Sequence, residues 1–573
     1  MNVINNLNIP MIMRKISNFL LKKLAVLAVI VTACSFTASA YDFMVDSICY
    51  NIIGENEVEI TQNEAYKVSG EVILPGTVNY DGVTYNVTCI GKYAFDNCKE
   101  ITFVSVPEGV TAIRYFAFAG CSSLEYVELP NSLTTIEQHG FYCCTSMKEF
   151  HIPRNLTNIA YNVFNSFANL LYYTCSPLNP RYRAVDGLLY SKDMTELVAY
   201  PAANPATSFD IPTYVTRLGD YCLHNCDNLT EINIHENVTE MGMNIFSGCD
   251  NIESIYIPDA VTCMGVTVFG DCKKLSQVHL PASADSLLSS FFTNCPSLTE
   301  VTIPRNIRYI GTFAFADCKN LKTINFEEGS RLNKIDLRAF EKCYALEEFI
   351  MPDSVTVLGG QILGYCNGLK NVHLSDNLQI LAGATFWYCT GLTELDIPGT
   401  VTFIGNAAIT GCTSLKRIKV GDKNSTPNIT FIEDCALDCA NIERIELGVN
   451  IDSIDSYGLD MSQNLKVLIS WSTTPPKTGS YGFYPYDAVL YVPKASVEAY
   501  RTAPKWNTFK TILPIEDVGD IDGNGSIGIS DVTRLIDMIL NGGDSNPLAD
   551  VDLNGYINIS DITELIDKVL NGN

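Results

Sequence analysis

Basic residues are scarce in this chain of 573 residues, which has 38 lysines and arginines against 64 aspartates and glutamates. Four of the basic residues lie in the first forty positions, so the remaining chain is more acidic still. A surface of net negative charge repels phosphate backbones and anionic lipids. This argues against nucleic acid and membrane surfaces as partners and favours cations.

Long apolar runs are also lacking, and we expect no transmembrane segment in the mature chain because a bilayer takes about twenty apolar residues. The apolar run at residues 24–33 follows two basic residues and precedes Ala-Ser-Ala at 38–40. This order predicts a signal peptide over residues 1–40 and hence a secreted or cell-surface protein. Two alternatives are a buried helix and a lipobox, which would anchor a lipoprotein through Cys34.

Sequence strings that carry known chemistries are missing as well. There is no Gly-x-Ser-x-Gly, no His-Glu-x-x-His, no phosphate-binding loop, and no Cys-x-x-Cys pair with zinc spacing. Glu348 and Glu394 would lie at about the carboxylate separation of an inverting glycosidase. However, rows of acids produce such pairs freely, and a shallow face does not raise a pKa. We therefore expect no enzyme and assign no catalytic residue.

Cysteine recurs at a fixed period, mostly of 23 residues. Phe167 and Ser462 occupy the same register without the sulfur, which makes about 15 units over residues 89–470. A fixed period in this range indicates a solenoid. The thirteen cysteines in register are Cys98, Cys121, Cys144, Cys226, Cys249, Cys272, Cys295, Cys318, Cys343, Cys366, Cys389, Cys412 and Cys439.

The residues around each cysteine follow one pattern. An aliphatic residue lies three positions after the cysteine, and apolar residues such as Val301 and Ile303 recur at six and eight. Spacing of two predicts a strand with both side chains inward. Proline often ends this strand, and an aromatic residue such as Phe315 lies three positions before the next cysteine.

These features resemble the BspA-like leucine-rich repeat family of bacterial surface proteins, most clearly in the phrase Ala-Phe-x-x-Cys at residues 94–98 and 314–318. The resemblance implies an α/β-class, mainly β solenoid used for adhesion or recognition at the cell surface. Around the repeats we expect an N-terminal β-rich cap at residues 41–88, an insertion with a hairpin near 175–209, and a C-terminal cap at 471–515.

The cysteines in register have an odd count, and Phe167 replaces one without changing the period. Neighbouring coils about 4.8 Å apart would permit disulfides. A site that accepts phenylalanine nevertheless favours a buried apolar residue. We predict buried free thiols.

Residues 516–573 differ in composition, with twelve acidic and two basic side chains. Two loops, 520–531 and 550–561, place oxygens at positions 1, 3, 5 and 12 and glycine at 6, as Ca²⁺ ligation requires. A backbone carbonyl serves at position 7, and position 9 is glycine in the first loop. The sequence predicts two calcium ions, held by Asp520, Asp522, Asn524, Ser526 and Asp531, and by Asp550, Asp552, Asn554, Tyr556, Asn558 and Asp561.

Each loop opens an amphipathic helix ended by Asn-Gly, and no entering helix precedes it. Loop-helix units with aspartate at position 12 resemble type I dockerins. That resemblance implies a small α-helical anchor for a cohesin-like or other protein, in assemblies that degrade polysaccharides. It places partner contacts at Ile529, Ser530, Ile559 and Ser560, where the isoleucines depart from the small polar pair common in cellulosomal members. An O-glycosyl hydrolase of such an assembly is the enzymatic alternative.

Side chains five and seven positions after each cysteine are predicted to face outward from the strands. They form mixed polar and aromatic rows suited to a host or bacterial surface protein or a glycan. Tyr256, His279 and Asn325 are the candidate contacts. An inert structural spacer is the alternative.

Overall fold

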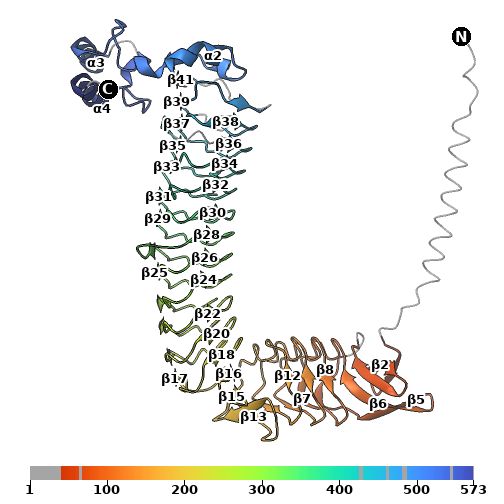
Figure 1. Cartoon of the computed structure of the whole chain (residues 1–573). Helices are drawn as coiled ribbons and strands as arrows, with labels where there is room; N and C mark the ends of the chain where they lie inside the picture. Colours follow the sequence, from red (N-terminus) through yellow and green to blue (C-terminus); the bar gives the residue numbers. More distant parts are fainter. Residues whose placement is uncertain are drawn as a thin grey trace, which may run out of the picture. The chain divides into compact units, whose positions relative to one another are not determined.

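Figure 1 shows the computed structural model, which describes residues 41–63, 67–424, 430–459, 464–479, 487–542 and 546–571. The predicted signal peptide, with Cys34, and the register position Ser462 lie outside these residues. The chain divides into two compact units. One consists of Met1–Ser166 and Ser176–Pro180, the other of Phe167–Cys175 and Arg181–Asn573.

The described part of the first unit begins with a β-rich region. The strands β1 (Phe43–Val45), β2 (Ile48–Gly54) and β3 (Glu57–Thr61) are antiparallel, and β5 (Thr77–Tyr80) is antiparallel to β6 (Val83–Ile90). From β6 the chain enters parallel coils. One row contains β8 (Ala112–Ile113), β10 (Thr135–Ile136) and β12 (Asn158–Ile159), and another contains β4 (Gly70–Ile73), β7 (Ile101–Ser105) and β9 (Tyr126–Glu128). β11 (Glu149–Ile152) follows in the next coil.

The second unit begins with β13 (Tyr172–Cys175) and the predicted insertion. β14 (Tyr182–Val185), β15 (Leu188–Ser191) and β16 (Glu196–Ala199) pair antiparallel. Asp186 and Gly187 turn the first hairpin with φ of 49° and 81°, as a two-residue hairpin turn requires. β16 then pairs in parallel with β18 (Arg217–Leu218), so the insertion joins the repeat ladder.

The coils of the second unit form two columns of short parallel strands (Figure 1). The first column contains β17 (Ser208–Asp210), β19 (Glu231–Asn233), β21 (Ser254–Tyr256), β23 (Gln277–His279), β25 (Glu300–Ile303), β27 (Thr323–Phe326), β29 (Glu348–Ile350), β31 (Asn371–His373), β33 (Glu394–Ile397), β35 (Arg417–Val420), β37 (Arg444–Leu447) and β39 (Val467–Ser470). The second contains β18, β20 (Glu240–Met241), β22 (Cys263–Met264), β24 (Ser286–Leu287), β26 (Tyr309–Ile310), β28 (Lys334–Ile335), β30 (Val357–Leu358), β32 (Ile380–Leu381), β34 (Phe403–Ile404), β36 (Thr430–Ile432), β38 (Ile451–Ile454) and β40 (Lys477–Thr478).

Two buried ladders hold the coils together. Phe269, Phe292 and Phe315 stack with ring centroids 5.1 to 5.3 Å apart. Beside them most ladder cysteines donate a hydrogen bond from the thiol to a backbone carbonyl one coil earlier, as Cys295 does to Phe269 at 2.9 Å; Cys226 instead donates to His224 in its own coil. The site therefore suits a small apolar residue that also satisfies a buried carbonyl. The thirteen ladder cysteines all have free thiols.

Residues 471–515, the predicted C-terminal cap, continue the first column. β41 (Val489–Val492) pairs in parallel with β39, and β42 (Thr511–Pro514) pairs with β41. Between them lie η1 (Lys494–Ser496), α2 (Val497–Thr502) and η2 (Trp506–Thr508). The C-terminal segment adds η3 (Ile515–Asp517), α3 (Ile529–Asn541), η4 (Pro547–Ala549) and α4 (Ile559–Asn571).

Candidate calcium centres and the outward strand face

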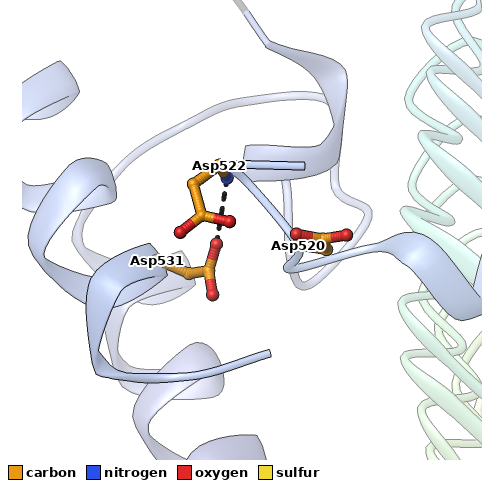
Figure 2. Close-up of side chains that lie close together, drawn as sticks. All are labelled: Asp520, Asp522 and Asp531. Atoms are coloured by element: carbon orange, nitrogen blue, oxygen red, sulfur yellow. Dashed lines mark hydrogen bonds between the residues drawn. The ribbon is translucent and has the colours of Figure 1, made fainter. Parts of the chain in front are cut away.

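The first acidic loop gathers three carboxylates ahead of α3 (Figure 2). Oxygens of Asp520, Asp522 and Asp531 lie within 4.8 Å of one another. Asp531, fully buried near the start of α3, accepts hydrogen bonds from the backbone N–H groups of Ile521 at 2.7 Å, Asp522 at 3.0 Å and Gly528 at 2.9 Å. This carboxylate at a helix N-terminus thereby fixes both ends of the loop.

The hydrogen bonding of the Asp520 carboxylate points to a ligand in this loop. Its Oδ2 accepts the N–H of Gly525 at 2.9 Å, while its Oδ1 is buried and has no hydrogen-bond partner among the described residues. The side chain is only 8% exposed. A buried carboxylate oxygen without a donor is costly unless a cation neutralises it. Gly523 and Gly525, with φ of 74° and 85°, make the sharp turn around it.

The second loop repeats this geometry ahead of α4. Asp550, Asp552 and Asp561 again converge within 4.8 Å. Asp561 accepts from the N–H groups of Val551 at 2.7 Å and Asn558 at 2.8 Å. Burial, with the charges of Asp561 and Asp552, raises the pKa of Asp550 to about 7 against the opposing hydrogen bond from Gly555. The carboxylates therefore repel one another when no cation is bound.

The remaining predicted ligands lie in the same two loops and brace them. Asn524 accepts hydrogen bonds from the backbone N–H of Ser526, and Asn554 accepts the corresponding bond from Tyr556, at 2.9 and 2.8 Å. Asn558 accepts the N–H of Ser560 at 2.9 Å. The carboxylates thus come together as two groups of three, one in each loop, and the amide and hydroxyl groups lie in the same loops.

The two helices leave apolar side chains in solvent. Leu535 and Leu565 are fully buried, whereas the four terminal aliphatic residues are 72 to 77% exposed. Those four residues are Ile529, Leu540, Ile559 and Leu570. Ser530 and Ser560 are exposed beside them. Each helix thus presents its predicted partner pair to solvent.

The predicted outward rows of the solenoid are exposed along most of the second unit. Tyr256 is 52% exposed and stacks on His279, with ring centroids 4.5 Å apart and planes 4° apart, because β21 and β23 place them in register. Asn325 is exposed on β27. At the C-terminal coils the row is covered: the Arg444 and Glu446 side chains are only 22% and 13% exposed.

Sequence reasoning missed a polar hollow of about 610 Å³ on the same face. Arg417, one of its lining residues, forms ion pairs with Asp396 at 2.8 Å and Glu394 at 3.1 Å, and His373 and Lys419 also line it. All five belong to the outward rows. The available signal was the change in charge pattern at Arg417, where basic side chains replace acidic ones in the row.

This structure is that of a leucine-rich repeat solenoid followed by a tandem pair of oxygen-rich loop-helix units. The chain belongs to the BspA type leucine rich repeat family, which it matches in six copies over residues 81–179, 199–308, 285–416 and 381–485. The match ends before the two acidic loops. No helix among the described residues is long and apolar enough to cross a membrane.

The chain is similar, at low identity, to solved structures of other leucine-rich repeat proteins. A leucine-rich repeat protein from Eubacterium ventriosum is 22% identical, with 65% of this chain and 94% of that chain covered and a TM-score of 0.38. One from Bacteroides ovatus is 23% identical, with 82% and 99% covered and a TM-score of 0.35. A leucine rich cell surface protein from Faecalibacterium prausnitzii is 22% identical, with 70% and 93% covered and a TM-score of 0.33. No curated protein matches the chain.

Proposed function

We propose that this protein is an exported, non-catalytic recognition protein with two working parts. The outward strand face of the solenoid binds a protein or glycan on a host or bacterial surface. The C-terminal loop-helix pair holds two calcium ions and attaches the chain to a partner protein. The observation that carries the proposal is the pair of matching carboxylate clusters, together with the unpartnered buried oxygen of Asp520.

The residues of each loop fit calcium. Ca²⁺ takes six to eight oxygens in an irregular shell, with aspartate, asparagine and backbone carbonyl groups all acceptable. In the first loop Asp520, Asp522, Asn524 and Asp531 would ligate through side chains and Ser526 through its carbonyl. In the second loop the matching residues would do so, joined by Asn558. The bound cation would supply positive charge that turns carboxylate repulsion into cross-linking of the loop.

The strand face suits recognition because it is exposed, varied and rigid. Tyr256 stacked on His279 presents flat aromatic surface, and the hollow around Arg417 presents both charges. Aromatic and arginine side chains are enriched where proteins bind partners. Strand pairing fixes their spacing, so little conformational entropy would be lost on binding.

The helices suit attachment to a protein. Ile529 and Leu540 on α3, with Ile559 and Leu570 on α4, leave apolar surface in water that a partner would bury. A cohesin-like domain or another protein fits this face equally. Because the two halves match, two docking orientations related by a pseudo-twofold axis are expected.

The test is a pull-down from native extracts with the whole mature chain as bait, with calcium and with chelator. Asp520→Ala combined with Asp550→Ala serves as the unloaded control. Partners retained only by the native bait in calcium support the proposed anchor. The same partners in both conditions, or none in either, would remove it.

A glycan array and a whole-cell binding assay test the solenoid separately. Binding that persists in chelator and weakens when Tyr256 and His279 are replaced supports the strand face. The absence of binding to any surface would favour an inert spacer, and release of reducing sugars from complex glycans would favour an enzyme.

A further inference from the structure

The second calcium loop lies against the strand face of the last coils, whereas among the described residues no hydrogen bond, ion pair or ring contact joins the first loop to that face. Tyr556, at loop position 7, donates a hydrogen bond from its hydroxyl to Glu443 at 2.7 Å, and the ammonium of Lys466 lies 3.4 Å from the centre of its ring. Arg444 donates to the backbone carbonyl of Asp552 at 2.8 Å. These contacts explain why the outward row is covered at β37.

Apolar packing continues this seam between the module and the solenoid. Val467, Ile469 and Tyr491 of β39 and β41 form one buried cluster with Val518, and Leu553 packs against it from the second loop. Tyr491 also donates a hydrogen bond to the carbonyl of Pro547 at 2.8 Å. The seam therefore connects the repeats to the segment that leads into the second loop, as well as to the loop itself.

The two loops differ at the positions that touch the solenoid. Position 4 is Gly523 in the first loop and Leu553 in the second, although both adopt positive φ, 74° and 55°. Leucine is unfavourable in this region by about 1 kcal/mol. Position 7 is Ser526 in the first loop and Tyr556 in the second. In the second loop, both the strained leucine and the large aromatic residue contact the solenoid.

We propose that the second loop is a calcium-dependent latch: calcium fixes it in the shape that docks on β37, β39 and β41, and docking in turn makes this loop bind calcium more tightly than the first. This inference rests on the proposed calcium sites. The reciprocity follows from linkage, because any contact made only by the calcium-loaded loop stabilises both calcium binding and docking. The contacts of Tyr556 and of the Asp552 carbonyl lie beside ligand positions, so loop shape controls them directly.

The latch has a specific functional consequence. With calcium it holds α3 and α4 in a fixed position on the end of the repeat array, and without calcium it releases them and uncovers the outward row at Arg444. The first loop, lacking these contacts, acts as an ordinary calcium site.

The main test leaves the module's sequence intact and changes only the solenoid. Glu443→Gln with Lys466→Met removes their ion pair and the cation over Tyr556, together with the ion pair that Glu443 forms with Lys416. Glu347→Gln with Lys370→Met removes the ion pair at the same register position in earlier coils, 3.5 Å long, and is the matched control. Calcium titration calorimetry on the full chain measures both sites.

We expect two binding constants about tenfold apart in the native chain, within the usual range of couplings between sites. Glu443→Gln with Lys466→Met should weaken the tighter constant about tenfold, and the control should change neither. Tyr556→Ser, which gives the second loop the residue of the first while keeping the ligating carbonyl, should match the seam variant. Two calcium ions bound with constants that the seam variant leaves unchanged would overturn the latch.

Hydroxyl-radical footprinting supplies a readout that does not measure calcium binding. Tyr491, fully buried at the seam, should be protected with calcium and oxidised with chelator. Protection that persists in chelator, in a chain that binds two calcium ions, would show that docking is independent of calcium and would refute the latch. A native chain that takes up no calcium refutes instead the proposed metal sites.

Discussion

Removing calcium should unfold α3 and α4 while leaving the repeats intact. Six aspartates converge in the two loops, and chelation or Asp520→Ala with Asp550→Ala would leave the clusters without their cation. Two helices of 13 residues are marginal alone in water. Their shared core is small, with five buried residues, and cannot replace the lost metal contacts.

The magnitude follows from mass action. A ligand that binds only the folded form at a hundred times its dissociation constant stabilises that form by about 2.7 kcal/mol, so two calcium sites contribute about 5 kcal/mol. Whole small domains are stable by about 5–15 kcal/mol. The loss is therefore as large as the total stability at the lower end of that range, whereas the buried ladders of the solenoid contain no comparable carboxylate cluster among the described residues.

Circular dichroism at 222 nm is the assay, because α3 and α4 hold most of the α-helix described and α2 has only 6 residues. We expect chelator to reduce the signal and the double aspartate variant to show the reduced signal from the start. Asp537→Ala with Asp567→Ala, which removes matching aspartates outside the loops, should keep it. An ellipticity that neither chelator nor the loop variant changes would refute the reasoning.

Three further predictions concern the solenoid. Cys295→Ala should lower the free energy of unfolding by about 1–2 kcal/mol in urea titrations. Alkylation in denaturant followed by mass spectrometry should find the ladder thiols free, and consistent disulfide peptides would contradict that expectation. Replacing Tyr256, His279 and Asn325 together should weaken surface binding without changing the circular dichroism, and undiminished binding would move the site to another face. Burial lowers the pKa of His224 to about 4 from 6.5, so on acidification the unfolded chain takes up a proton before the folded chain does. The free energy of unfolding should therefore fall by up to about 3 kcal/mol as the pH drops from 6.5 to 4. His224→Gln should flatten this pH profile, and an unaltered profile would exclude His224 as its cause.

The repeating fold was predictable because each coil contacts only its neighbours. Cysteine, leucine and phenylalanine positions in one coil therefore report directly on the tertiary contact with the next. The predicted small apolar site at Cys295 was confirmed as buried, and the structure adds its hydrogen bond to Phe269. The outward position of Tyr256 and His279 followed from strand alternation alone.

The seam and the polar hollow were not predictable in the same way. Tyr556 and Glu443 lie 113 residues apart, and no periodic pattern relates them. The loop pattern indicated calcium ligands, yet it gave no sign that position 7 of one loop would touch the repeats. The differences Gly523 against Leu553 and Ser526 against Tyr556 were visible in the sequence, but their meaning depends on which surface lies beside the loop.

Because the strand columns advance by a regular step, the number of coils sets the distance between a given position on the solenoid and the C-terminal helices. Because Ser254 pairs with Gln277 and Glu300 with Thr323 at the same 23-residue offset, a coil gained or lost between them would leave every other contact unchanged. Each such coil would move the Tyr256 platform by about 4.8 Å relative to the C-terminal helices. Relatives with more or fewer coils would then hold the two proposed binding parts at different separations, without any change in either part.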